Sequence, residues 1–262
     1  MRYFQWNADP ILFSYGNITI GWYGLLFATG FYLGFHLMRW VYKRDNKPLA
    51  SLDVLFIYMV LGAVIGARLG HCLFYDPAYY LANPLQILKI WEGGLASHGG
   101  TVGMLVAVYV YSMQTPGINF IWILDRITLP VALGSFFIRC GNFFNSEIIG
   151  IPTTVPWAVI FSRVDSLPRH PAQLYEAAVY LMLLIILVLL YKKHGNEMKP
   201  GSMMGLLMIV IFGSRFLLEF VKIPQESFEP IAGLNMGQWL SIPFVVLGVY
   251  FMKAKINNQA KD

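Results

Sequence analysis

Charged residues are scarce in this chain. Only 13% of its 262 residues are charged, whereas 57% are hydrophobic, and this charged fraction is about half that of a typical soluble domain. Several apolar runs reach about 18–20 residues, which is long enough for a helix to cross a bilayer. The sequence lacks the segments of about ten residues with alternating polarity that indicate a membrane β-barrel. The composition therefore predicts an all-α polytopic membrane protein.

Cysteine is also rare, and several motifs of hydrolytic enzymes are absent. Cys72 and Cys140 are the only two cysteines, too few for a disulfide framework or a cysteine-rich metal site. Cys140 is either a nucleophile or a small residue that fills a helix end, and the second interpretation is favoured. There is no Gly-x-Ser-x-Gly, no His-Glu-x-x-His and no glycine-rich phosphate loop with lysine. We therefore expect neither serine nor zinc hydrolysis, and no metal or cofactor.

The distribution of basic residues predicts the topology. Seven transmembrane helices are expected, over residues 18–38, 52–75, 98–113, 119–138, 172–191, 202–221 and 237–251. Lysine and arginine cluster after the first, fifth and seventh of them, which favours the cytoplasm for that side. The C-terminus is then cytoplasmic and the N-terminus outside. The same rule explains the net charge of +5, so we expect no nucleic-acid binding.

We expect residues 1–262 to form a single integral membrane domain. Residues 143–170 contain three prolines, at 152, 156 and 168, and a possible strand within residues 155–161. This segment is interpreted as a small folded cap outside the membrane. No internal repeat and no cleavable signal peptide are evident, and the lack of repeats counts against a secondary transporter.

The most informative segment spans residues 139–150, at the end of an apolar run. It contains an arginine, two asparagines and a glutamate. Asn142 and Asn145 offer amide donors for a phosphate or for a developing charge, and Glu147 is suited to orient an arginine or to act as a base. We interpret this segment as part of a polar site at a lipid–water boundary.

A second polar pair, Arg215 and Glu219, lies four residues apart on one predicted helix and shares a face. Either the two side chains neutralise each other, or Glu219 orients Arg215 towards an anionic ligand. Arg139 and Arg215 both fall near the outer ends of their predicted helices. Two guanidinium groups at that depth suit a phosphate, whose oxygens they bind in pairs.

His98 opens a predicted helix and is followed by Gly99 and Gly100. It is either a structural histidine or a general base, because its ordinary pKa lies close to the working pH. For Arg68 with His71, and for Asp125 with Arg126, pairing inside the protein is favoured over a role in chemistry.

Several ordered motifs resemble one family, the prolipoprotein diacylglyceryl transferases of bacterial plasma membranes. Residues 139–150 match its signature Gly-Arg-x-Gly-Asn-Phe-x-Asn-x-Glu-x-x-Gly at every fixed position after the first, where this chain has Ile138. Further matches cover residues 22–24, 66–70, 93–94, 98–100, 169–176 and 215–219. The resemblance therefore extends along most of the chain.

The resemblance implies an activity and its substrates. A family member moves the diacylglyceryl group of phosphatidylglycerol to the lipobox cysteine thiol of a prolipoprotein signal peptide, and it releases glycerol phosphate. It does so as a multi-pass protein of the bacterial inner membrane, surrounded by membrane lipids. The reactive sulfur belongs to the substrate, which fits the lack of a convincing nucleophile in this chain.

The resemblance and the residue chemistry together predict the site. The expected catalytic residues are His98, Arg139, Asn142, Glu147, Arg215 and Glu219. The expected substrate-binding residues are Tyr23, Arg68, Gly99, Arg139, Gly150 and Arg215. In this hypothesis the two arginines clamp the phosphate, Glu147 and Glu219 hold the arginines, and His98 helps to remove the thiol proton. The alternatives are a membrane transporter for an anionic solute and a non-catalytic scaffold.

Overall fold

The structure is a computed structural model, which describes residues 3–16, 18–223 and 233–254. It is 71% helical. Four of its helices are long and apolar enough to cross a membrane. They are α2 (Leu49–Phe74), α5 (Phe120–Asn145), α6 (Ala172–His194), and α7 (Ser202–Leu218) continued by the 3-10 turn η4 (Glu219–Val221). The predicted class of helical membrane protein agrees with this arrangement.

The other three predicted transmembrane segments also fall on helices. They overlap α1 (Trp22–Arg44), α4 (Ser97–Gln114) and α8 (Met236–Lys253). The number of seven membrane crossings stays a prediction, because only the four helices above combine the length and the apolar composition of a membrane span within the described residues.

The chain also contains short strands, so it is not purely helical. The first predicted span begins four residues too early, because Ile18–Gly21 forms strand β3 and α1 starts at Trp22. β3 pairs antiparallel with β2 (Ile11–Tyr15) across a turn in which Gly16 has a φ of +57°. The β-branched residues of β3 favour an extended backbone, and the pairing satisfies those of its backbone groups that face β2.

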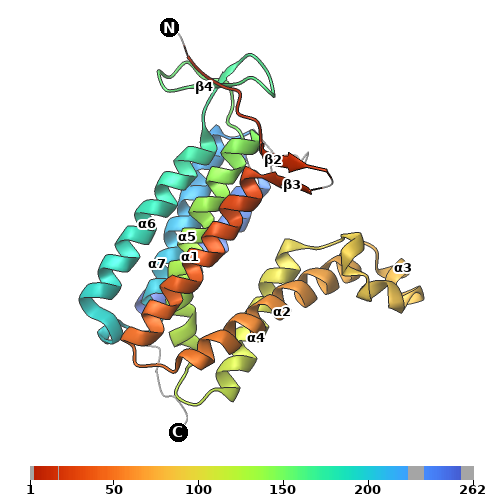
Figure 1. The fold of residues 1–262 in the computed structure, drawn as a ribbon. Coiled ribbons are helices and arrows are strands. Elements are labelled where there is room, and N and C mark those ends of the chain that lie inside the picture. The colour runs from red at the N-terminus through yellow and green to blue at the C-terminus, as the bar shows by residue number, and fades with distance from the viewer. Residues whose placement is uncertain (1–2, 17, 224–232, 255–262) are drawn as a thin grey trace. The chain divides into compact units, whose positions relative to one another are not determined.

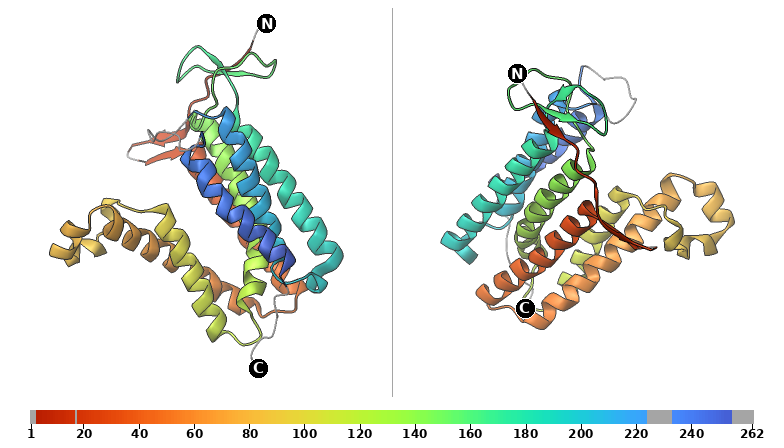
Figure 2. Two further views of the ribbon diagram at one scale, coloured as in Figure 1. Left: turned by 180° about the vertical axis from the view of Figure 1, so that it is seen from behind. Right: turned by 45° about the horizontal axis from the view of Figure 1, so that its top comes forward.

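The chain divides into two compact units, which we describe separately. The first comprises Met1–Met38 and Leu124–Asn257, and the second comprises Arg39–Ile123 and Asn258–Asp262. In the first unit, α5, α6, α7 and α8 run alongside one another with the greater part of α1 (Figures 1 and 2). Small residues allow close packing there: a Cβ added to Gly205 of α7 would lie 2.7 Å from the carbonyl oxygen of Gly248 in α8.

Residues between α5 and α6 form a small sheet with the start of the chain. Strand β4 (Val159–Phe161) pairs in parallel with β1 (Phe4–Trp6) and antiparallel with β5 (Pro168–Arg169). The strand expected within residues 155–161 is therefore present. Phe143 and Ile149 form a buried cluster with the strand residues Val159 and Phe161. The location of this segment outside the membrane stays a prediction.

The second unit is built on α2 and α4. Between these helices lie α3 (Pro77–Ala82) and the 3-10 turns η1 (Pro84–Leu88) and η2 (Ile90–Glu92). Glycines bring α2 and α4 into backbone contact: a Cβ added to Gly70 would lie 2.8 Å from the Cα of Gly99. A groove of about 970 Å³ follows the two helices, with largely apolar lining residues that also include His98.

Candidate active site

Arg139 and Asn142 lie on the last turns of α5. The sequence placed the end of this helix at Ile138, but the structure continues it to Asn145. Arg139 and Asn142 are therefore three residues apart on one helical face, where such side chains are neighbours. Nη1 of Arg139 donates a hydrogen bond to Oδ1 of Asn142 over 3.0 Å. Asn142 is buried, so this contact is shielded from solvent.

The end of α5 returns Glu147 towards the helix. Ser146 has a φ of +57°, and its N–H donates to the carbonyl of Phe143. The N–H of Glu147 donates to the carbonyl of Asn142 over 2.9 Å, and these two bonds define a Schellman motif. The Glu147 carboxylate then accepts from Asn142 Nδ2 over 3.2 Å and from Asn145 Nδ2 over 3.0 Å. Asn142 thus links Arg139 to Glu147.

The segment after this turn is held by the Gln173 side chain of α6 and by the backbone of His170, just before that helix. Ile148 has a φ of +55°, which is uncommon for a β-branched residue and needs support from its surroundings. On one side, the fully buried Gln173 of α6 donates a hydrogen bond to the carbonyl of Glu147. On the other side, the N–H of Gly150 donates to the carbonyl of His170 over 2.9 Å. A Cβ added to Gly150 would lie 2.7 Å from the Val221 carbonyl oxygen, so close packing requires glycine there.

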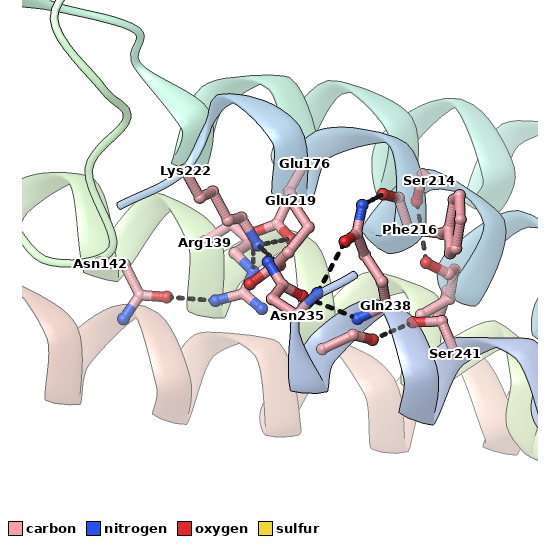
Figure 3. Close-up of polar contacts among 12 residues, drawn as sticks. Arg139, Asn142, Glu176, Ser214, Phe216, Glu219, Lys222, Asn235, Gln238 and Ser241 are labelled. Atoms are coloured by element: carbon pink, nitrogen blue, oxygen red, sulfur yellow. Dashed lines mark hydrogen bonds and ion pairs between the residues drawn. The ribbon is translucent and has the colours of Figure 1, made fainter. Parts of the chain in front are cut away.

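A buried ion-pair network lies beside Arg139 (Figure 3). Nε of Arg139 is 2.6 Å from Oε2 of Glu176, whose side chain is 0% exposed. Oε1 of the same carboxylate accepts a hydrogen bond from Nζ of Lys222 over 2.6 Å. Nζ of Lys222 is also 3.6 Å from Oε2 of Glu219. The Glu176 carboxylate therefore connects Arg139 with Lys222.

Glu219 has a different ion-pair partner from the one expected. It is the first residue of the 3-10 turn η4, and its carboxylate pairs with Lys222, three residues further on, instead of with Arg215. The spacing of three residues is that of neighbours in a 3-10 turn. The carboxylate also approaches the start of α8, where a Cβ on Gly237 would lie 3.0 Å from Oε1 of Glu219. The positive end of that helix stabilises a carboxylate.

Arg215 belongs to the same neighbourhood as the network. The Tyr180 hydroxyl interacts electrostatically with Glu176, Arg139 and Arg215. Nε of Arg215 is buried and has no hydrogen-bond partner among the residues that the structure describes. An unsatisfied buried donor of this kind is costly, and an anionic ligand would supply the missing acceptor.

Tyr23 of α1 also lies beside the predicted segment. A Cβ added to Gly141 would be 2.8 Å from Cδ2 of the Tyr23 ring. Glycine at this position therefore allows the tyrosine ring to pack against the backbone of α5, one residue before Asn142. Seven predicted site residues lie in the first unit: Tyr23, Arg139, Asn142, Glu147, Gly150, Arg215 and Glu219.

The other three predicted site residues, Arg68, His98 and Gly99, lie in the second unit. Arg68 donates from Nε to the carbonyl of Ile87, from Nη1 to that of Gly93 and from Nη2 to that of Gln86, over 2.5–2.8 Å. Its guanidinium thereby holds the connector between α2 and α4. His98 is exposed at the start of α4.

Glu176 and Lys222 were not among the predicted site residues. The sequence contained a signal for Glu176, because a carboxylate within a predicted transmembrane helix requires a partner. Its partners could not be inferred, since they come from α5 and from the residue after η4. Lys222 resembled an ordinary basic residue of a loop.

Comparison with known proteins identifies the family. The family model described as prolipoprotein diacylglyceryl transferase matches residues 10–254. The chain belongs to this family. A relative from Chloroherpeton thalassium, named phosphatidylglycerol–prolipoprotein diacylglyceryl transferase, is 53% identical over 247 residues, which cover 94% of this chain and 92% of the relative.

Two further relatives carry the same name. The protein of Tolumonas auensis is 48% identical over 256 residues, covering 98% of this chain and 99% of that protein. The protein of Bacteroides fragilis is 43% identical over 260 residues, covering 95% and 94%. The predicted membership of the prolipoprotein diacylglyceryl transferase family is thus confirmed, and the chain is a membrane transferase.

Within this family member, Asp165 and Arg169 form an ion pair in the loop before α6. The pKa of Asp165 is lowered, because the Arg169 guanidinium donates hydrogen bonds to its carboxylate. The Leu167 N–H adds a weaker bond. Arg169 also donates to the carbonyl of Gly150 over 3.3 Å, so this ion pair supports the segment that follows the Glu147 turn.

Acidification is expected to loosen this loop. Because the pKa of Asp165 is lowered in the folded state, the ion pair stabilises the loop above the unfolded-state pKa of about 4, and this stabilisation is lost as the pH falls through the folded-state value. Hydrogen exchange of residues 162–170, corrected for intrinsic rates, should therefore rise on acidification from about pH 6 to about pH 3. The same rise in Asp165→Asn would contradict this assignment.

Proposed function

We propose that the chain transfers the diacylglyceryl group of phosphatidylglycerol to the lipobox cysteine thiol of a prolipoprotein. The carbon–oxygen bond between the diacylglycerol and the phosphate breaks, and a carbon–sulfur bond forms. The products are a thioether and glycerol phosphate. Family membership over residues 10–254 supports this proposal. The structural observation that carries it is the ion pair of Arg139 with the buried Glu176, together with the buried Nε of Arg215, which has no hydrogen-bond partner among the described residues.

Arg139 and Arg215 are the proposed phosphate clamp. A phosphodiester carries one negative charge, and the departing glycerol phosphate gains a second as the carbon–oxygen bond breaks. Donors fixed in advance stabilise such a developing charge because they need no reorganisation during the reaction. The Arg139 guanidinium is fixed through Nε by Glu176 and through Nη1 by Asn142. The contact with Asn142 is a hydrogen bond, whereas the contact with Glu176 is an ion pair.

Asn142 and Glu147 are proposed to orient this clamp. Because Nδ2 of Asn142 donates to Glu147, Oδ1 is the atom that faces Arg139. Glu147 therefore acts on Arg139 through Asn142, and the direct contact predicted between Glu147 and an arginine is replaced by this relay. Tyr23, which packs on Gly141, is proposed to line the lipid site.

Three predicted substrate-binding residues are better assigned to positioning the backbone. Arg68 bonds carbonyls of the connector, Gly99 packs against Gly66 and Gly70, and Gly150 packs against His170 and Val221. We propose that these residues shape the protein around the substrate instead of contacting it.

We propose that the protein is a multi-pass enzyme of the bacterial inner membrane. Seven spans would place the N-terminus outside and the C-terminus in the cytoplasm, as the basic clusters indicate. Residues 143–170 then form an extracytoplasmic cap of a single membrane domain. A transporter for an anionic solute is not favoured, because the chain belongs to a family of transferases.

The activity is tested with purified protein, phosphatidylglycerol and a synthetic peptide that contains a lipobox cysteine. Mass spectrometry should show a gain of one diacylglyceryl group on the peptide, and glycerol phosphate should appear in equal amount. A peptide with serine in place of cysteine serves as the control and should remain unmodified. Unmodified cysteine peptide in the presence of intact phosphatidylglycerol would refute the proposal.

Replacement of Arg139 by lysine should impair catalysis strongly. Lysine keeps the charge but loses the planar fork that contacts Glu176, Asn142 and a phosphate together. We expect kcat to fall by about 10²-fold to 10³-fold, the effect of losing one donor to a developing anion. Arg163→Lys is the matched control, because Arg163 is exposed in the loop before α6. Similar kcat values for Arg139→Lys and the control would contradict the proposed role of Arg139 in binding the phosphate.

His98 is the proposed acceptor of the thiol proton, because a thiolate is the competent nucleophile. A neutral imidazole can accept a proton from a thiol, which suits this role. In His98→Gln the acidic limb of the pH profile of kcat/KM should disappear and the rate should fall by about 10²-fold or more. An unchanged pH profile in a correctly inserted variant would rule out His98 as the base.

A further inference from the structure

We propose that Lys222 is a positioning residue for the transfer reaction: through Glu176, it keeps Arg139 available to the lipid phosphate. This inference rests on the proposed function. Lys222 directly follows η4, and its side chain is only 6% exposed. Its Nζ lies 2.6 Å from Oε1 of Glu176 and 3.6 Å from Oε2 of Glu219.

The side chain of Lys222 is not required to hold the backbone around it. The N–H of Ile151 donates to the carbonyl of Val221 over 3.0 Å, and the N–H of Ile223 donates to the carbonyl of Ile149 over 3.2 Å. These backbone bonds fix the segment on both sides of Lys222. A buried ammonium group carries a large desolvation cost, so its presence is better explained by the two carboxylates that it faces.

Lys222 and Arg139 share one carboxylate. Lys222 binds Oε1 of Glu176 and Arg139 binds Oε2 through Nε. Without Lys222, the negative charge of Glu176 would be balanced by Arg139 alone. A carboxylate and a guanidinium prefer a two-pronged contact, which would occupy further donors of Arg139. Lys222 therefore limits how strongly Glu176 holds Arg139.

The charges of the site lead to the same conclusion. Among the described residues, this neighbourhood contains three cations, Arg139, Arg215 and Lys222, and three carboxylates, Glu147, Glu176 and Glu219. These charges balance one another, so the site without Lys222 would carry one excess negative charge. That excess would repel the anionic lipid headgroup.

The test compares steady-state kinetics of purified variants with phosphatidylglycerol and a lipobox peptide. In Lys222→Met, the KM for phosphatidylglycerol should rise by about tenfold or more, the size expected when one partner of a buried charge pair is removed. The KM for the peptide should stay unchanged. Lys222→Arg should remain near wild type because it keeps the charge. Lys193→Met, at an exposed lysine near the end of α6, is the matched control.

A double variant separates this role from a purely structural one. If Lys222 acts by balancing Glu176, then Glu176→Gln should lower the raised KM in the Lys222→Met background by about threefold or more, a non-additive effect typical of residues in contact. Global damage would reduce the amount of active enzyme without this recovery. Lys222→Gln provides a second single variant, with the same expected rise in KM.

The inference is overturned by a KM for phosphatidylglycerol in Lys222→Met and Lys222→Gln that equals the wild-type value. It is also overturned if Glu176→Gln brings no recovery in either background. Wild-type transfer is measured in the same series. Failure of the wild type to modify the peptide would refute the proposed function itself, whereas normal wild-type transfer with unaffected lysine variants would refute only the role of Lys222.

Discussion

The buried carboxylate of Glu176 is the interaction on which the site depends. It is inaccessible to solvent and binds Arg139 of α5 and Lys222 of the segment after η4. Because Glu176 itself belongs to α6, three parts of the first unit meet at two oxygen atoms. A charge in such a setting is tolerated only with close partners, so the helices are fixed relative to one another where the arginine must be presented. The contact between Glu176 and Arg139 therefore stabilises the packing of the helices and also orients the Arg139 side chain.

The second constraint is the way in which α5 ends. The left-handed residue Ser146 closes the Schellman motif and turns the chain back, so that Glu147 reaches the Asn142 side chain. Backbone bonds from His170 and Val221 then hold the following residues in place. The local sequence thus produces a rigid group of Arg139, Asn142 and Glu147. The charged partners of this group, Glu176 and Lys222, come from α6 and from the residue after η4. Rigid support of this kind is what electrostatic catalysis requires.

Much of the helical framework could be predicted because long apolar runs report directly on helix position. All seven predicted segments overlap helices over most of their length, and the segment at residues 139–150 was selected from its residue types. The predictions were wrong where contacts between residues distant in the sequence, or the local helix type, determine the structure. Ile18–Gly21 pairs with β2, so it became a strand instead of the start of a helix. The 3-10 turn at Glu219 directed its carboxylate to Lys222, although the spacing in an α-helix favoured Arg215. The role of Glu176 could not be predicted, because its partners Arg139 and Lys222 are far from it in the sequence.

The central claim is that Arg139 and Arg215 hold the lipid phosphate beside the Glu176 carboxylate. The most direct test is an experimental structure of the protein with phosphatidylglycerol bound. We predict phosphate oxygens at hydrogen-bond distance, about 2.7–3.1 Å, from guanidinium nitrogens of both arginines, with the contact between Arg139 and Glu176 retained. A phosphate bound away from both guanidinium groups would contradict the account.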